Sequence, residues 1–140
     1  MSTVAIVYWS GTGNTEAMAD LVKEGVESAG GSAKLIQAAD FSSAQLAEFD
    51  AVAFGCPAMG AEELEDAEFE PMWDGVESDL PGVKIALFGS YDWGTGEWME
   101  TWEQRALDAG ANVVTTAIAN LYPEGEEAEA CKALGAELAS

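Results

Sequence analysis

Histidine is absent from this 140-residue sequence, and only two cysteines and five lysines or arginines are present. Without histidine, catalysis by a Ser-His or Cys-His pair and any histidine-ligated metal site are excluded. Cys56 and Cys131 are too few for a disulfide framework, a zinc ribbon or a four-cysteine iron–sulfur cluster. Two lone thiols are typical of a reducing compartment, so we expect a cytoplasmic protein. Any chemistry of this chain is therefore expected to come from a bound organic cofactor.

The chain is strongly acidic. It contains 26 Asp and Glu residues but only 5 Lys and Arg residues, which gives a formal net charge of −21. Nucleic acids and anionic membrane surfaces bind to basic faces, so neither is an expected partner. No apolar run approaches the roughly 20 residues of a membrane span, and no leader sequence is recognisable. Hydrophobic residues make up 49% of the sequence. We therefore expect one domain over residues 1–140, which is soluble and monomeric.

Five apolar runs at regular intervals predict five β-strands. The runs at Thr3–Tyr8, Ala51–Gly55 and 83–89 are nearly continuous, as expected for strands that are covered on both faces of a sheet. The runs at 33–38 and 113–119 contain polar residues, which is typical of edge strands.

The segments between these runs have the apolar period of helices, over residues 18–29, 69–80, 98–109 and 128–138, with a shorter helix expected at 42–47. This alternation predicts an α/β fold, a doubly wound five-stranded parallel sheet with right-handed crossovers and helices on both faces. The strand order expected for this length is 2-1-3-4-5. In that order, ligands bind at the carboxyl ends of strands one, three and four.

The loop after the first strand continues directly into a helix and reads Ser10-Gly11-Thr12-Gly13-Asn14-Thr15. Glycines let the backbone turn its amides inward, and a helix N-terminus carries partial positive charge. Side-chain hydroxyl and amide groups add further donors, so the loop is predicted to bind a phosphate without a cation. The alternative is an ordinary turn of small residues. The lysine of a P-loop and the third glycine of a dinucleotide fingerprint are both missing.

The loops after the third and fourth strands carry large side chains beside glycines. Met59 stands in the first of these loops and Trp93 in the second. Tryptophan at a ligand-binding edge is typical of stacking on a planar ligand, and methionine can cover the opposite face of that ligand. Together with a phosphate loop, this arrangement describes flavin mononucleotide (FMN). The alternative is that both side chains only cap the end of the sheet.

Three motifs in this order resemble the short-chain flavodoxins of anaerobic bacteria. They are YWSGTGNTE at residues 8–16, GCPAMG at 55–60 and FGSYDWG at 88–94. The similarity extends over essentially the whole chain, and its length leaves no room for the insertion that marks long-chain flavodoxins. The resemblance implies a flavodoxin-like fold with FMN as cofactor, no metal and no catalytic residue.

The resemblance also implies a role for each loop. Residues Ser10 to Thr15 bind the FMN phosphate with Ser90 nearby, Met59 and Trp93 flank the isoalloxazine ring, Glu62 accepts from the flavin N3–H, and the Gly60 carbonyl turns toward N5. The expected cofactor-binding residues are Ser10, Gly11, Thr12, Gly13, Asn14, Thr15, Pro57, Ala58, Met59, Gly60, Ala61, Glu62, Ser90, Tyr91, Asp92, Trp93 and Gly94. Asp92 departs from the family pattern, which has glycine there.

The expected function is that of a low-potential one-electron carrier, which shuttles electrons between redox enzymes and turns over no substrate of its own. The alternatives are an FMN-dependent NAD(P)H or quinone reductase of the same fold and a non-redox FMN-binding module. Acidic residues directly follow the third-strand loop, at Glu62, Glu63, Glu65, Asp66, Glu68 and Glu70. We expect them to form a docking face for redox proteins that carry basic patches.

Overall fold

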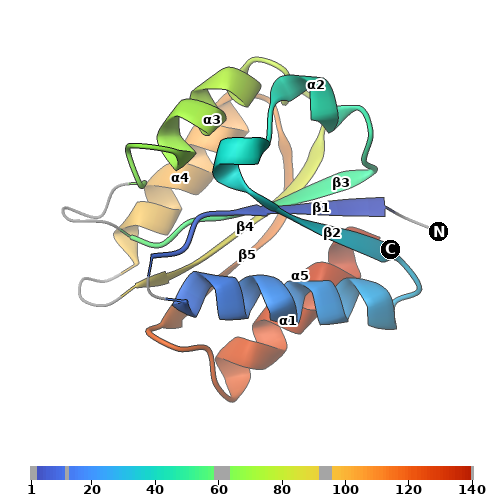
Figure 1. The fold of residues 1–140 in the computed structure, drawn as a ribbon, viewed down its shortest axis with the longest axis vertical. Helices are drawn as coiled ribbons and strands as arrows, with labels where there is room; N and C mark the ends of the chain where they lie inside the picture. The colour runs from blue at the N-terminus through green and yellow to red at the C-terminus, as the bar shows by residue number, and fades with distance from the viewer. Residues whose placement is uncertain (1–2, 12, 59–63, 92–95, 140) are drawn as a thin grey trace.

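A computed structural model of the chain describes residues 3–11, 13–58, 64–91 and 96–139 (Figure 1). It contains a five-stranded sheet of order β2-β1-β3-β4-β5 in which every pairing is parallel, as the sequence predicts. The strands are β1 (Thr3–Tyr8), β2 (Ser32–Gln37), β3 (Ala51–Gly55), β4 (Lys84–Tyr91) and β5 (Asn112–Asn120). The helices are α1 (Asn14–Ser28), α2 (Ser43–Leu46), α3 (Phe69–Glu77), α4 (Glu97–Asp108) and α5 (Glu126–Ala139), with a 3-10 turn at Ala38–Asp40.

The burial of the strands follows their apolar content. Every residue of β3 is buried, and so is every residue of β1 after Thr3, because both strands lie inside the sheet and are covered on both faces. The edge strands β2 and β5 are largely exposed or half-buried, which confirms their predicted positions. Strand β4 extends two residues beyond the predicted run, because Ser90 and Tyr91 pair with Ala119 and Asn120 of β5.

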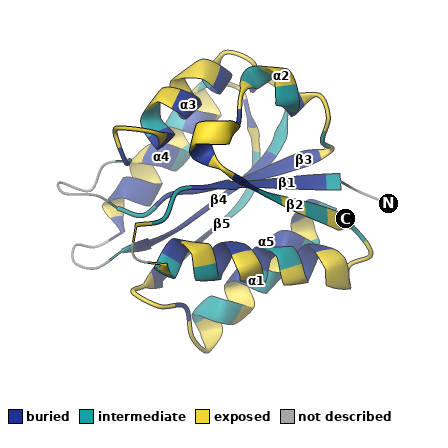
Figure 2. Ribbon diagram, in the orientation of Figure 1, coloured by how far each residue is buried: buried dark blue, intermediate teal, exposed yellow. Residues whose placement is uncertain are grey.

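Helices cover both faces of the sheet and create two separate cores. Helices α1 and α5 lie on one face, and α2, α3 and α4 lie on the other (Figure 1). The buried sides of the helices face the sheet and their outer sides are exposed (Figure 2). No helix in the described part of the chain is long and apolar enough to cross a membrane.

The face covered by α3 and α4 has an aromatic core. Trp73, Trp98 and Trp102 are buried there, on the sides of α3 and α4 that face the sheet. Trp102 meets Trp73 and Phe69 edge to face, with ring centroids 5.6 and 5.4 Å apart. This geometry is favourable for aromatic pairs and rigidly joins the two helices that follow strands β3 and β4.

The opposite face depends on two glycines where α1 and α5 cross. A Cβ atom on Gly25 would lie 1.9 Å from the carbonyl oxygen of Lys132, and one on Gly135 would lie 2.0 Å from that of Val22. Each glycine therefore lets the backbone of the other helix approach closely.

Candidate functional site

The carboxyl ends of β1, β3 and β4 meet at one edge of the sheet, as the strand order requires. Backbone hydrogen bonds continue beyond the strands there. The N–H of Trp9 donates to Gly55 at 3.0 Å, that of Cys56 to Phe88 at 3.1 Å, and that of Ala58 to Ser90 at 3.0 Å. The three segments in which the sequence predicts a ligand site are thereby held side by side.

The loop after β1 is built around the side chain of Ser10. The Ser10 hydroxyl oxygen accepts from the backbone N–H groups of Gly13 at 3.1 Å and Glu16 at 3.3 Å. Gly13 precedes helix α1 with φ at 95°, a left-handed conformation that glycine adopts without strain. Ser10 therefore shapes the loop in this structure by accepting hydrogen bonds.

Thr15 and Ser90 connect this loop to strand β4. Their hydroxyl oxygens lie 3.0 Å apart, and both side chains are buried, with relative exposures of 1% and 5%. Seventy-five positions separate the two residues in the chain. The predicted proximity of Ser90 to the phosphate loop is therefore found in the fold.

The residues of this loop fit a phosphate group. A Cβ atom on Gly11 would lie 2.9 Å from the Cη2 atom of Trp9, so a larger residue at this position would require the indole to shift. Residues 10–16 contain no lysine or arginine, while the N-terminus of α1 and the hydroxyls of Ser10 and Thr15 supply neutral donors. The loop thus offers an anion the kind of donors that the phosphate end of FMN requires.

The structure describes only part of the predicted site. Pro57, Ala58 and Tyr91 are half-buried at the same sheet edge, and the Tyr91 ring lies 5.7 Å from that of Trp98. The predictions for Thr12, Met59, Gly60, Ala61, Glu62, Asp92, Trp93 and Gly94 lie outside the described residues.

Comparison with known proteins identifies the family. The family model named flavodoxin matches residues 6–135. A curated flavodoxin from Megasphaera elsdenii is 49% identical over 132 residues, which cover 94% of this chain and 95% of that protein. The chain belongs to the flavodoxin family.

Other flavodoxins agree with this assignment. A flavodoxin from Clostridium beijerinckii is 41% identical over 96% of this chain and 98% of its own length. The solution structure of two-electron reduced Megasphaera elsdenii flavodoxin superimposes with a TM-score of 0.90 at 48% identity, covering 97% of this chain and 98% of that one. Flavodoxins bind FMN and transfer electrons without turning over a substrate, so this chain is an FMN-dependent electron carrier rather than a reductase.

The prediction that Glu65 belongs to a docking face is wrong. Its side chain is only 5% exposed, so it does not belong to a surface docking face. The carboxylate accepts from the backbone N–H groups of Ala67, Glu68 and Phe69 at 2.8–2.9 Å. Burial tends to raise the pKa of Glu65, but these three hydrogen bonds outweigh it and lower the pKa. Glu65 thus holds the turn that leads into helix α3 and caps the first residue of the helix, Phe69.

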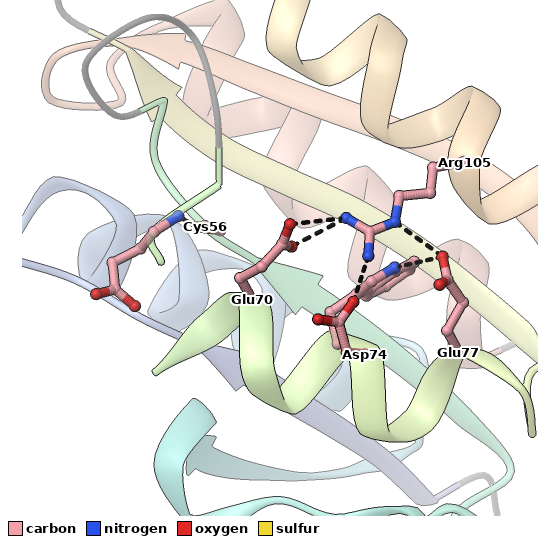
Figure 3. A network of polar contacts seen from close by, with 7 residues as sticks. Cys56, Glu70, Asp74, Glu77 and Arg105 are labelled. Atoms are coloured by element: carbon pink, nitrogen blue, oxygen red, sulfur yellow. Dashed lines mark hydrogen bonds and ion pairs between the residues drawn. The ribbon is translucent and has the colours of Figure 1, made fainter. Parts of the chain in front are cut away.

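The side chain of Glu70 forms an ion pair within the protein. The guanidinium of Arg105 on α4 lies among Glu70, Asp74 and Glu77 of α3, at 2.9, 2.6 and 2.9 Å (Figure 3). Burial opposes the charge of Arg105, but hydrogen bonds to Glu77 and Glu70 raise its pKa. This cluster joins the two helices that follow the second and third loops of the site.

Neither cysteine has the surroundings of a reactive thiol. Cys56 and Cys131 are unpaired and buried. Burial raises the pKa of Cys131 to about 12 and that of Cys56 further still. The Cys56 sulfur accepts the backbone N–H of Glu65 at 3.3 Å, so Cys56 is a structural contact beside the site.

Proposed function

We propose that this flavodoxin binds FMN at the joint carboxyl edge of β1, β3 and β4 and passes single electrons at low potential between redox proteins. The observation that carries the proposal is the cation-free loop from Ser10 to Thr15, joined to β4 by the Thr15–Ser90 contact. FMN supplies the redox chemistry when it is bound. The proposed binding residues are the predicted ones, including those outside the described residues.

The charge of the chain favours a low reduction potential. No lysine or arginine in the phosphate loop offsets the charge of a bound phosphate, and the whole chain carries −21. Adding an electron near uncompensated negative charge is unfavourable. One unit charge about 10 Å away contributes roughly 1.7 kcal/mol at an effective dielectric of about 20, before screening.

We further propose that the partners carry basic patches and that the protein works in the cytoplasm. Helix α4 follows the Trp93 segment and presents Glu97 and Glu100, both exposed. Both line a groove between α3 and α4, together with Asp108 and with Asp74, which is paired with Arg105. Opposite charges accelerate encounter between proteins, so the rate of electron exchange should fall as salt rises. Two unpaired, buried thiols are compatible with a reducing compartment.

The test is a titration of the cofactor-free protein with FMN and with riboflavin, followed by stepwise reduction of the complex. FMN should bind at least about tenfold more tightly, since a phosphate adds charged hydrogen bonds. The second one-electron potential should lie below that of free FMN. Equal affinity for FMN and riboflavin would show that residues 10–15 do not bind the phosphate. A second potential equal to that of free FMN would show that the negative charge of the protein does not lower it.

A further inference from the structure

A hydrogen bond between two side chains links the residue before the phosphate loop (residues 10–15) to the residue before helix α3. The Trp9 indole N–H donates to a carboxylate oxygen of Glu68 at 2.9 Å. Fifty-nine positions separate the two residues. Trp9 lies directly after β1, and Glu68 directly before α3. The contact therefore joins segments that follow two different central strands.

The Trp9 ring reaches the phosphate loop itself. Its backbone is fixed to β3 by the hydrogen bond to Gly55. Its six-membered ring lies so close to Gly11 that a Cβ there would be 2.9 Å from Cη2 and 3.2 Å from Cζ3. The indole thus lies beside Gly11, on the side where any other residue would carry its Cβ.

Glu68 is itself held in place. Its backbone N–H donates to the buried Glu65 carboxylate at 2.8 Å, and the N–H of Met72 donates to its carbonyl at 3.3 Å. A fixed backbone limits where the Glu68 carboxylate can reach. Hydrogen bonds therefore connect Glu65 to Glu68 and Glu68 to Trp9, whose ring lies beside Gly11.

We propose that Glu68 is a positioning residue for phosphate binding, because it holds the Trp9 indole against Gly11 and so sets the shape of the phosphate loop. The inference rests on the proposed function, since it takes residues 10–15 to bind the FMN phosphate. Glu68 itself lies directly before α3 and does not contact the phosphate in this role. Its effect should fall on FMN and spare riboflavin, which lacks the phosphate.

Two variants of Glu68 separate the hydrogen bond from the charge. Glu68→Gln and Glu68→Met both remove the negative charge at similar size, but only glutamine can still accept from Trp9. Glu68→Met should weaken FMN binding about three- to tenfold relative to Glu68→Gln, the contribution of one hydrogen bond, and leave riboflavin affinity unchanged. Fluorescence titration of the cofactor-free protein measures both affinities.

Trp9→Phe removes the same hydrogen bond from the other side. It should lower the FMN-to-riboflavin affinity ratio as Glu68→Met does, and the double variant should be no worse than either single variant. Asp66→Asn, at an exposed acid two positions away, controls for lost charge and should behave as Glu68→Gln does.

The outcomes distinguish this inference from the proposed function. If the wild-type protein fails to prefer FMN over riboflavin, the phosphate site itself is wrong. If it does prefer FMN but Glu68→Met matches Glu68→Gln, or if FMN and riboflavin weaken equally, the positioning role is wrong. A fall in melting temperature alone, with the affinity ratio unchanged, also overturns it, because that result describes a merely structural contact.

Discussion

The hydroxyl groups of Thr15 and Ser90 form a buried hydrogen bond of 3.0 Å between helix α1 and strand β4. Removing one partner leaves the other hydroxyl buried without a partner, which costs about 1–3 kcal/mol. Thr15→Val and Ser90→Ala should each lower the free energy of unfolding of the cofactor-free protein by that amount. The double variant should lose less than the sum, as measured by urea unfolding. Additive losses would show that the two hydroxyls are energetically independent.

The glycines between α1 and α5 should respond to alanine in the direction opposite to ordinary helical glycines. Alanine in place of a helical glycine normally stabilises by about 0.5–1 kcal/mol. At Gly25 and Gly135 the added Cβ would overlap a backbone carbonyl oxygen, so each variant should lose about 1–3 kcal/mol of unfolding free energy. Gly75 in α3 is the matched control, because no atom lies within 4 Å of its would-be Cβ. Gly75→Ala should be stabilising, and a similar response at all three positions would contradict the close approach.

The capping role of Glu65 predicts a specific pH dependence. Because folding lowers the Glu65 pKa from its ordinary value of 4.5, the stabilisation is complete above that value and disappears as pH falls through the folded pKa. Glu65→Gln should therefore lose about 1–3 kcal/mol at pH 7, since its amide group cannot accept from Ala67. The difference from wild type should begin to shrink below about pH 4.5, where the carboxyl of the unfolded state becomes protonated, and should vanish once the pH falls below the lowered pKa of the folded state.

Ser42→Ala provides the control for this experiment. Ser42 and Gln45 form a capping box at the start of α2 without an ionisable group. The loss of stability caused by Ser42→Ala should not change with pH over the same range. A Glu65→Gln deficit that is equally constant with pH would exclude an ionised cap.

The Arg105 cluster should contribute a salt-sensitive part of the stability. Arg105→Ala leaves Glu70, Asp74 and Glu77 close together on one helix, and we expect a loss of about 1–2 kcal/mol at low salt, because these pairs are partly exposed. The loss should become smaller in 1 M salt, where both attraction and repulsion are screened. Urea unfolding at the two salt concentrations measures it.

Two further variants calibrate the Arg105 result. Arg105→Lys should be intermediate, because lysine keeps the charge but lacks the planar fork. Lys132→Ala, which removes an exposed pair with Glu129 at 3.6 Å, should have almost no effect. The Arg105 guanidinium carbon also lies 6.0 Å from the centroid of the Trp73 ring. An Arg105→Ala deficit that is identical at both salt concentrations would assign the loss to packing against Trp73 instead.

The fold was predictable because its elements differ strongly in local pattern. The strands Thr3–Tyr8 and Ala51–Gly55 have the predicted bounds, since a strand buried on both faces must be apolar throughout. Helix α1 begins at Asn14, before its apolar stripe starts, because a helix can open with polar residues at a ligand-binding loop. The motif at residues 10–15 indicates this start of the helix, because it predicts a loop that continues directly into a helix.

The roles of the acids could not be predicted from the same patterns. Glu65 and Asp66 are neighbours in one acidic run, yet the first is buried and the second is exposed. One signal was available: the position before Phe69 is Glu68 rather than Ser, Thr, Asp or Asn, so the first N–H groups of α3 need an acceptor from elsewhere. The partners of Trp9 and Arg105 depend on distant residues and carry no local signature.

The order of the strands also determines when the protein can fold during its synthesis. Strand β1 is translated before its neighbour β3, which begins at residue 51, and before α5, which packs against α1 and begins at residue 126. The apolar side of α1, including Met18, Val22 and Val26, is therefore buried only after Leu134 and Leu138 of α5 have been synthesised. Until α5 has been translated, this core remains open to water, so we expect the nascent flavodoxin to be accessible to chaperones and proteases up to that point.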